Sequence, residues 1–390
     1  MTTSPLIKKL SEFGEGFKHH HENYAAESIS KIRETGGVWD FGALVFHFPE
    51  HFGFCYGVDK AIDMVFETCS RFANRRIFLT DQLIHNPYIN GKLKEKGVEY
   101  LKRDERHLLV CDGLKAGDVV VVSAFGTDFR DIERLEAKGV MIVDSTCGAI
   151  TSVWKRVESY AKNGFITVMH GKRNHEETRA TLSQAVKEGG VTIAIENIRE
   201  AEELASVIRG QMTEDTFLKK YPAAVLENFS FDSLTCRMGM ANQTTMLKGE
   251  SLEIQKLLRQ AFQDRFGEEA TKERFKSFDT ICGATQDRQD AMRNLLAKKL
   301  DLVLIVGGFN SSNTTHLAEI AHDKLPYFHI EGDGDILSKD EIRARDPRDG
   351  QVRVEKGWFK SGTKNIGITS GASTPDVTLL AIIEKICALK

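Results

Sequence analysis

The chain of 390 residues is long enough for two or three compact domains with cores of their own. Its 53 basic and 56 acidic residues give a formal net charge of −3 without a long basic tract, which argues against nucleic-acid binding. No apolar run approaches the roughly 18 residues of a membrane span, and the N-terminal sequence lacks the apolar stretch of a secretory signal, so we expect a cytoplasmic protein with small-molecule or protein partners.

The first 42 residues form a polar N-terminal extension that we expect to be helical. It contains three consecutive histidines, His19, His20 and His21, without a nearby acidic or cysteine partner at the spacing of a metal motif. We therefore expect this histidine run to lie on a solvated surface.

After the extension, short apolar runs alternate with helical patterns. An apolar or β-branched strand followed by small or polar residues and then a helix is expected around residues 43–48, 118–126, 140–148 and 301–313. This alternation predicts an α/β protein with mostly parallel sheets, in which ligands bind beyond the carboxyl ends of the strands.

The pattern favours three similar α/β modules, interrupted by two stretches that we treat as accessory, residues 196–233 and 331–362. We expect the modules to comprise residues 56–146, residues 147–281, and residues 43–55 with 282–390.

Three of the seven cysteines share one local setting, because Cys55, Cys147 and Cys282 each follow an extended segment and precede a helix. Seven cysteines are too sparse for a disulfide framework in a chain of this length, and an odd number cannot all pair. A repeated strand-to-helix unit would bring three thiols together around a pseudo-threefold axis, and three thiolates on a four-iron cluster would leave one iron open to a substrate. Three inert, buried thiols are the alternative, and spacing alone does not decide between the two interpretations.

The other four cysteines lack this setting. Cys69 lies on the apolar face of an expected helix, and Cys387 lies in the apolar C-terminal helix. We expect these two, and likewise Cys111 and Cys236, to lie in cores or loops.

The stretches that contain these three cysteines, together with others along the chain, resemble the LytB/IspH family of 4-hydroxy-3-methylbut-2-enyl diphosphate reductases. The resemblance rests on eight stretches in family order, GFCYGVDKAI, LIHNPYI, DSTCG, HEETRAT, NQTTM, FDTICGATQDRQDA, VGGFNSSNTTHLAEIA and GITSGASTPD. It implies a three-module trefoil around one [4Fe–4S] cluster with three cysteine ligands, at Cys55, Cys147 and Cys282, and one open iron. The implied reaction adds two electrons and two protons to an allylic alcohol and releases water, giving isopentenyl and dimethylallyl diphosphates.

The resemblance also assigns residues around the substrate. Glu177 matches the acid that delivers protons near the departing hydroxyl, and Thr244 matches a threonine that hydrogen-bonds that hydroxyl. Without the resemblance, Glu177 would be a first-turn helix glutamate and Thr244 a turn residue. The positions implied around the diphosphate are His85, His175, Ser311, Ser312, Asn313 and Ser373, although serine and asparagine also cap helices routinely.

One position departs from the family pattern, because Phe125 stands where many bacterial members have a histidine in the phosphate pocket. Phenylalanine cannot donate a hydrogen bond, so the number of phosphate donors differs here. The local sequences resemble the cyanobacterial and plant-plastid branch most. The acidic N-terminal extension is unlike a transit peptide, so we expect the cytoplasm rather than the plastid stroma.

Two other functions compete with the reductase. A quinolinate synthase-like lyase would not need the HEET, SSN and GAS elements, and a redox sensor or scaffold would need the cysteines alone. No GxGxxG fingerprint after a strand indicates a nicotinamide or flavin cofactor, so we expect electrons to come from a ferredoxin or flavodoxin.

Overall fold

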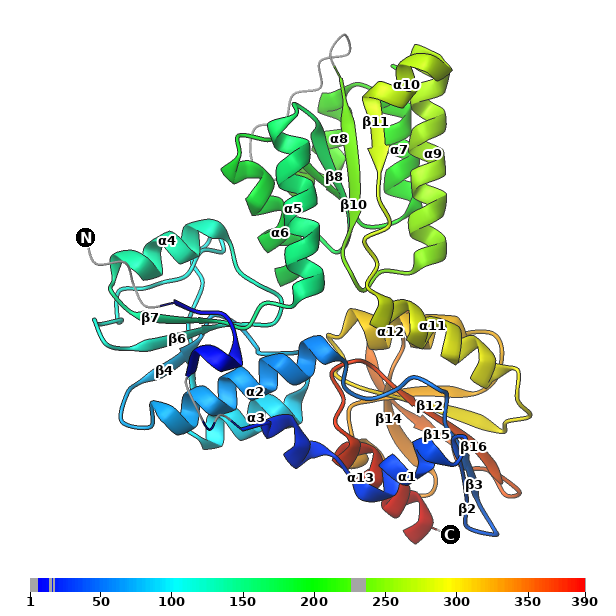
Figure 1. Cartoon of the computed structure of the whole chain (residues 1–390). Helices are drawn as coiled ribbons and strands as arrows, with labels where there is room; N and C mark the ends of the chain where they lie inside the picture. Colours follow the sequence, from blue (N-terminus) through cyan, green and yellow to red (C-terminus); the bar gives the residue numbers. More distant parts are fainter. Residues whose placement is uncertain (1–5, 14–15, 17, 226–235, 390) are drawn as a thin grey trace. The chain divides into compact units, whose positions relative to one another are not determined.

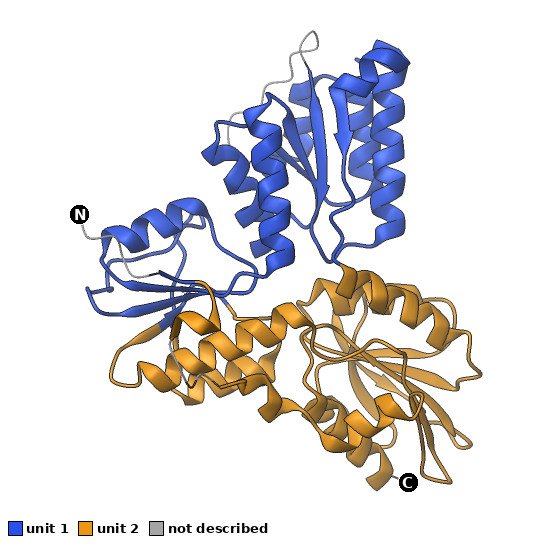
Figure 2. Cartoon of the chain, in the orientation of Figure 1, with its two compact units in different colours: residues 1–7, 78–81, 100–282 blue, residues 8–77, 82–99, 283–390 orange. Residues whose placement is uncertain are grey.

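The computed structural model describes residues 6–13, 16, 18–225 and 236–389, and it forms two compact units. Unit 1 comprises Met1–Ile7, Phe78–Asp81 and Tyr100–Cys282, and unit 2 comprises Lys8–Ile77, Gln82–Glu99 and Gly283–Lys390 (Figure 2). The strands form three sheets in which parallel pairing dominates, so the prediction of an α/β protein is confirmed. The proposed boundaries of three modules remain a prediction.

The first sheet has five strands and belongs largely to unit 1. Its order is β1 (Leu6–Ile7), β7 (Met141–Asp144), β6 (Val119–Val122), β4 (Ile77–Leu79) and β5 (Glu99–Tyr100), and β1, β7 and β6 pair in parallel. The four valines of β6 are all buried, as expected of a strand covered on both faces. Helix α4 (Phe129–Ala137) begins at the N-cap Asp128 and buries Leu135 in this core.

The second sheet lies entirely in unit 1, and its pairings are all parallel. Its order is β11 (Phe275–Ser277), β10 (Met238–Asn242), β8 (Ile166–His170) and β9 (Thr192–Ile195). Neighbouring residues of β8 enter different cores, because Val168 packs on the side of α7 (Ile198–Ile208) and α9 (Lys248–Phe266) and Met169 on the side of α5 (Gly148–Lys162) and α6 (Glu176–Lys187). Helices therefore cover both faces of this sheet, as Figure 1 shows. Three shorter helical segments complete this part of the chain, α8 (Glu214–Lys220), η3 (Pro222–Ala224) and α10 (Glu268–Arg274).

The third sheet lies in unit 2 and has seven strands. Its order is β15 (Val352–Lys356), β14 (Glu341–Arg345), β13 (Tyr327–Ile330), β12 (Leu302–Val306), β16 (Asn365–Ser370), β3 (Val45–His47) and β2 (Val38–Asp40). The four central strands are parallel, whereas β2, β14 and β15 join antiparallel at the edges. The stretch 331–362, treated as accessory, therefore supplies edge strands and η4 (Asp333–Asp335). Helices α11 (Gly283–Leu296) and α12 (Ser312–Ala321) pack on one core of this sheet, and α1 (Glu27–Glu34) and α13 (Asp376–Ala388) on the other.

Unit 2 also contains α2 (Tyr56–Arg71), α3 (Pro87–Glu95) and the described part of the N-terminal extension after Ile7. The expectation of a helical extension holds only in part, because α1 and the short η1 (Leu10–Phe13) and η2 (His20–Tyr24) alternate with strand and loop. The expectation that the three histidines lie on a solvated surface holds for His19, whose side chain is 51% exposed, but only in part for His20 and His21, which are 13% and 28% exposed. All three rings contact carboxylates of α2. Residues 226–233 of the other accessory stretch lie outside the described residues.

Among the helices that the structure describes, none combines the length and apolar character that crossing a membrane requires.

Candidate functional site

The three cysteines selected by their sequence setting occupy equivalent positions in the structure. Cys55 is the N-cap of α2, Cys147 is the N-cap of α5, and Cys282 directly precedes the first residue of α11. All three thiols are half-buried. The prediction that each cysteine stands at the start of a helix is confirmed, so each lies at the positive end of a helix dipole.

The remaining cysteines differ in their surroundings. Cys111 and Cys236 are buried within apolar cores, and Cys387 packs against another core. Burial raises the pKa of Cys111 and raises that of Cys69 to about 11, so both stay protonated thiols. The expectation of cores or loops is thus confirmed for Cys111, Cys236 and Cys387, while Cys69 is half-buried near the end of α2. None of these four stands at the start of a helix, which singles out the three cysteines that do as the candidate ligands.

Unit 1 places the predicted acid next to the predicted threonine. Helix α6 begins after His175, whose Nδ1 accepts a hydrogen bond from the main-chain N–H of Glu177 at 3.1 Å. The Glu177 side chain is 1% exposed, and its Oε1 accepts the N–H of Thr244 at 2.6 Å. Burial raises the pKa of Glu177 to about 7, against the opposing effect of main-chain and side-chain hydrogen bonds from Thr244. This carboxyl group is therefore able to hold and release a proton near neutral pH.

Thr244 also connects Glu177 to one of the three cysteines, Cys282. The carbonyl oxygen of Thr244 accepts the N–H of Cys282 at 3.0 Å, while its own N–H donates to Glu177. A single peptide segment thus fixes Glu177 and Cys282 in one arrangement, although the three residues are far apart in the sequence.

Cys147 is linked to the same part of unit 1 through the SAFG segment. Its N–H donates to the carbonyl oxygen of Ala124 at 3.0 Å. The next residue, Phe125, sets its ring edge-on to the ring of His175, with centroids 5.4 Å apart. The phenylalanine that departs from the family pattern therefore packs against a histidine rather than donating a hydrogen bond.

Unit 2 gathers Cys55 with most of the predicted diphosphate-binding residues. The N–H of Cys55 donates to the carbonyl oxygen of Ala372 at 3.3 Å, and the N–H of Ala372 donates to Oδ1 of Asn313 at 3.1 Å. Ser373 Oγ donates to the carbonyl oxygen of His85 at 3.2 Å. The buried members of this group are His85, Ser311, Ser312, Asn313 and Ser373.

The start of α12 supplies the serines and the asparagine. Ser311 is its N-cap and accepts the N–H of Thr314, and Ser312 and Asn313 form the first turn. Asn313 Nδ2 donates to Thr285 Oγ1 at 3.2 Å, which fixes the amide between α11 and the loop after β16. Capping and anion binding use the same group of N–H donors, so the sequence reading of a helix cap and that of a phosphate site are compatible.

In their neutral forms, His85 and His175 carry the ring proton on the same nitrogen, Nε2. The amide Nδ2 of Asn310 can only donate, so at 2.9 Å it makes Nδ1 of His85 the acceptor. The N–H of Glu177 does the same for His175. In its neutral form each ring therefore presents Nε2–H, which is the donor that an anionic ligand requires.

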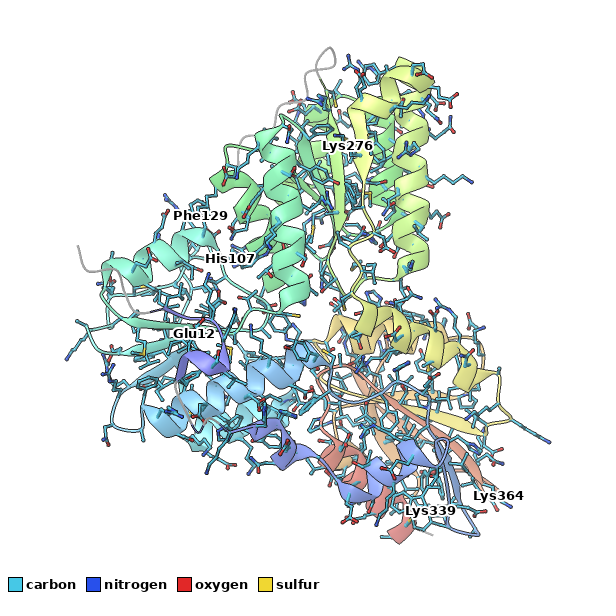
Figure 3. All side chains as sticks on the ribbon, viewed as in Figure 1. Glu12, His107, Phe129, Lys276, Lys339 and Lys364 are labelled. Carbon is cyan, nitrogen blue, oxygen red and sulfur yellow. The ribbon has the colours of Figure 1, made fainter. Side chains whose placement is uncertain are left out.

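Two residues of this site were missed by sequence reasoning. Asn310, which orients His85, lies in the stretch VGGFNSSNTTHLAEIA that resembles the family. Its position directly before Ser311 could have identified it as a site residue. Glu176 lines a cavity of about 140 Å³ with Arg103, Arg179 and His107, the last labelled in Figure 3. Burial, followed by the charge of Asp81, raises the pKa of Glu176 to about 7.

Comparison with known proteins gives a consistent result. The LytB protein family model matches residues 47–387. A protein of Picosynechococcus sp. named 4-hydroxy-3-methylbut-2-enyl diphosphate reductase is 40% identical, with 97% of this chain and 94% of that protein covered. A protein of the same name from Gloeobacter violaceus is also 40% identical, with 94% and 88% covered.

Solved structures agree with the sequence comparisons. A structure of (E)-4-hydroxy-3-methyl-but-2-enyl diphosphate reductase, described as the terminal enzyme of the non-mevalonate pathway, matches with a TM-score of 0.54 at 25% identity, covering 88% of this chain and 99% of that one. A structure of the E-1-hydroxy-2-methyl-but-2-enyl-4-diphosphate reductase from Plasmodium falciparum matches in fold with a TM-score of 0.64 at 21% identity, covering 87% of this chain and 86% of that one.

Proposed function

Because the chain belongs to the LytB protein family, we propose how its own residues carry out the reaction for which its relatives are named. The chain is an oxidoreductase of the 4-hydroxy-3-methylbut-2-enyl diphosphate reductase type, an iron–sulfur enzyme of the non-mevalonate isoprenoid pathway. Family membership decides against the lyase and the redox sensor that the cysteine pattern alone leaves open.

We propose that Cys55, Cys147 and Cys282 hold one [4Fe–4S] cluster. Three observations support this ligand set. The three thiols share one position at the start of a helix, all are half-buried, and none lies in an apolar core cluster as Cys111 and Cys236 do. Thiolates are the ligands that iron–sulfur clusters require, so the donor chemistry fits.

When bound, such a cluster supplies electrons to the substrate and offers one iron without a protein ligand. Two electrons and two protons convert the allylic C–O bond into a C–H bond and release the oxygen as water. One proton leaves with the hydroxyl oxygen, and the other is delivered to carbon.

We assign the proton that leaves with the hydroxyl to Glu177. Its side chain is enclosed and its pKa lies near 7, so a substantial fraction is protonated in neutral solution. Proton donation leaves a carboxylate that the N–H and hydroxyl of Thr244 stabilise. The Thr244 hydroxyl is therefore suited to orient the substrate alcohol and pass the proton, and this arrangement at Glu177 is the observation that carries the proposal.

We propose that the diphosphate is bound by neutral donors rather than by a lysine or arginine clamp. His85 and His175 offer Nε2–H groups, and Ser311, Ser312, Asn313 and Ser373 surround the N-terminus of α12 or the loop after β16. The dipole of α12 adds favourable potential for the anion.

The electrons must come from a separate protein, for which we propose a ferredoxin or a flavodoxin. We also propose a cytoplasmic location, since the thiols that hold the cluster require a reducing compartment.

The proposal is tested by anaerobic purification, iron and sulfide analysis, and turnover of the allylic diphosphate with a reduced donor. We expect about four iron and four sulfide ions per chain and formation of both five-carbon diphosphates. A cluster-loaded protein that binds the substrate but releases no water and no isoprenoid diphosphate contradicts the assigned activity.

A further inference from the structure

The histidines of the N-terminal extension form a cluster with a buried carboxylate of α2, within unit 2. His19 Nδ1 lies 2.9 Å from Asp63 Oδ2, and His21 Nδ1 lies 2.9 Å from both oxygens of Asp63. These ligand-type atoms all lie within 4.8 Å of one another. Asp63 is almost fully buried, with 3% of its side chain exposed, whereas the two rings keep one side toward solvent.

Contacts that do not involve these ring nitrogens hold the cluster together. The main-chain N–H of His21 donates to Asp63 Oδ1 at 2.9 Å, and the Tyr24 ring packs against that of Phe66 with centroids 5.7 Å apart. The two Nδ1 atoms and the carboxylate are therefore brought together by the fold of η2 on α2. A preorganised set of this kind binds a metal ion without a large conformational cost.

The third histidine of the run has a different partner. His20 Nε2 lies 3.0 Å from Glu67 Oε2, and Arg71 Nε donates to the other oxygen of Glu67 at 2.5 Å. An arginine thus balances the charge of Glu67. The charge of Asp63, in contrast, is met by two imidazole rings, each of which binds a cation once its Nδ1 proton is displaced.

We propose that His19, His21 and Asp63 form a binding site for a divalent transition-metal ion such as Zn²⁺. Two imidazole nitrogens and one carboxylate are ligands that Zn²⁺ and its first-row neighbours accept, with water completing the coordination. Asp59, one turn before Asp63 on α2, adds a second acidic group whose charge acts on the same cluster. The ion would fasten the extension to α2, the helix that begins directly after Cys55.

This site is separate from the thiols proposed for the cluster, and a direct test must distinguish the two. Zn²⁺ is added anaerobically to the cluster-loaded full chain in competition with a chromophoric zinc chelator, and zinc-edge X-ray absorption is recorded on the complex. We expect one bound ion with nitrogen and oxygen ligands at about 2.0–2.1 Å rather than sulfur at about 2.3 Å. Sulfur ligation of that ion, or no binding, overturns the proposal.

Substitutions on neighbouring histidines supply the matched comparison. We expect His21→Ala and His19→Ala to weaken zinc binding by at least about 10–100-fold, which is the range found when even supporting groups of metal sites are removed. His20→Ala keeps all three proposed ligands and should bind zinc as the unmodified chain does. Because His21→Ala also removes a packing contact, circular dichroism and iron content are measured on each variant. Equal zinc affinity in all four proteins, with folding intact, contradicts the assignment.

Discussion

Replacing Glu177 with glutamine should make the protein more stable at neutral and alkaline pH while strongly reducing turnover. The side chain is fully enclosed, and its pKa rises from an ordinary value of 4.5 to about 7 because burial penalises the charged form. Below pH 4.5 the carboxyl group is protonated in both the folded and the unfolded chain, so it adds no pH dependence. As the pH rises toward 7 and beyond, the unfolded chain ionises more readily, and the free energy of unfolding falls.

The size of this effect follows from the two pKa values. The difference between the pKa of Glu177 in the folded chain, about 7, and its ordinary value of 4.5 lowers the free energy of unfolding by roughly 3 kcal/mol, at 1.36 kcal/mol for each pKa unit. Glutamine cannot ionise but keeps an oxygen that accepts the N–H of Thr244, so the folded geometry is preserved. Relative to the unmodified chain, Glu177→Gln should therefore gain up to about 3 kcal/mol between pH 4.5 and pH 8.

The assay is denaturant unfolding of both proteins at several pH values, with the cluster loaded and the iron content matched. We expect the stability difference to grow with pH up to about 7 to 8 and then level off. Turnover should fall by about 10²–10⁴, the usual contribution of a general acid. Parallel pH dependence of the two proteins would refute the raised pKa, and turnover within a factor of two of the unmodified chain would refute the catalytic role.

Three further changes test other parts of the site. Serine substitution of single proposed ligands should abolish turnover and lower the bound iron. Cys69→Ala, at a half-buried thiol away from any helix start, should keep its iron. Iron analysis of anaerobically prepared protein checks this for Cys55, Cys147 and Cys282. Thr244→Val should reduce kcat by about 10–100-fold yet keep the cluster, because the main-chain bonds of residue 244 remain. Thr244→Ser keeps a hydroxyl and should retain most of the rate of the unmodified chain. Loss of iron in Thr244→Val would show that the side chain has a structural role. Gly126→Ala should destabilise the chain by about 1–3 kcal/mol, because the glycine has φ +82° and an added Cβ would clash with the Trp154 ring. Gly249→Ala, in α9 with open space around the added Cβ, should not destabilise the chain in the same thermal unfolding measurement.

Local patterns in the sequence were enough to predict the helix starts that carry the cysteines. An extended run followed by small residues and an amphipathic segment fixes where a helix begins, so the positions of Cys55 and Cys147 as N-caps follow from neighbouring residues alone. The mostly parallel sheets follow in the same way from the alternation of strands and helices.

Contacts between distant segments were beyond the reach of such patterns. The expected solvated surface holds only in part at His21, because its partner, Asp63, lies 42 residues later and reaches it only through the packing of η2 on α2. The same limit applies to Thr244, which accepts the N–H of Cys282 and donates to Glu177 67 residues earlier. Family resemblance named the residues of the proposed site, but their hydrogen-bond partners depend on the tertiary fold.

In Thr244 the main chain and the side chain have separate roles, because both bonds to Glu177 Oε1 and to the N–H of Cys282 are made by main-chain groups. Its peptide groups hold Glu177 and Cys282 in one arrangement whatever side chain is attached, while its hydroxyl donates to Glu177 and keeps its lone pairs for the proposed substrate. Changes of side chain at this position can therefore adjust the chemistry without disturbing the scaffold. Such a position is a good starting point for redesigning which alcohols the enzyme accepts.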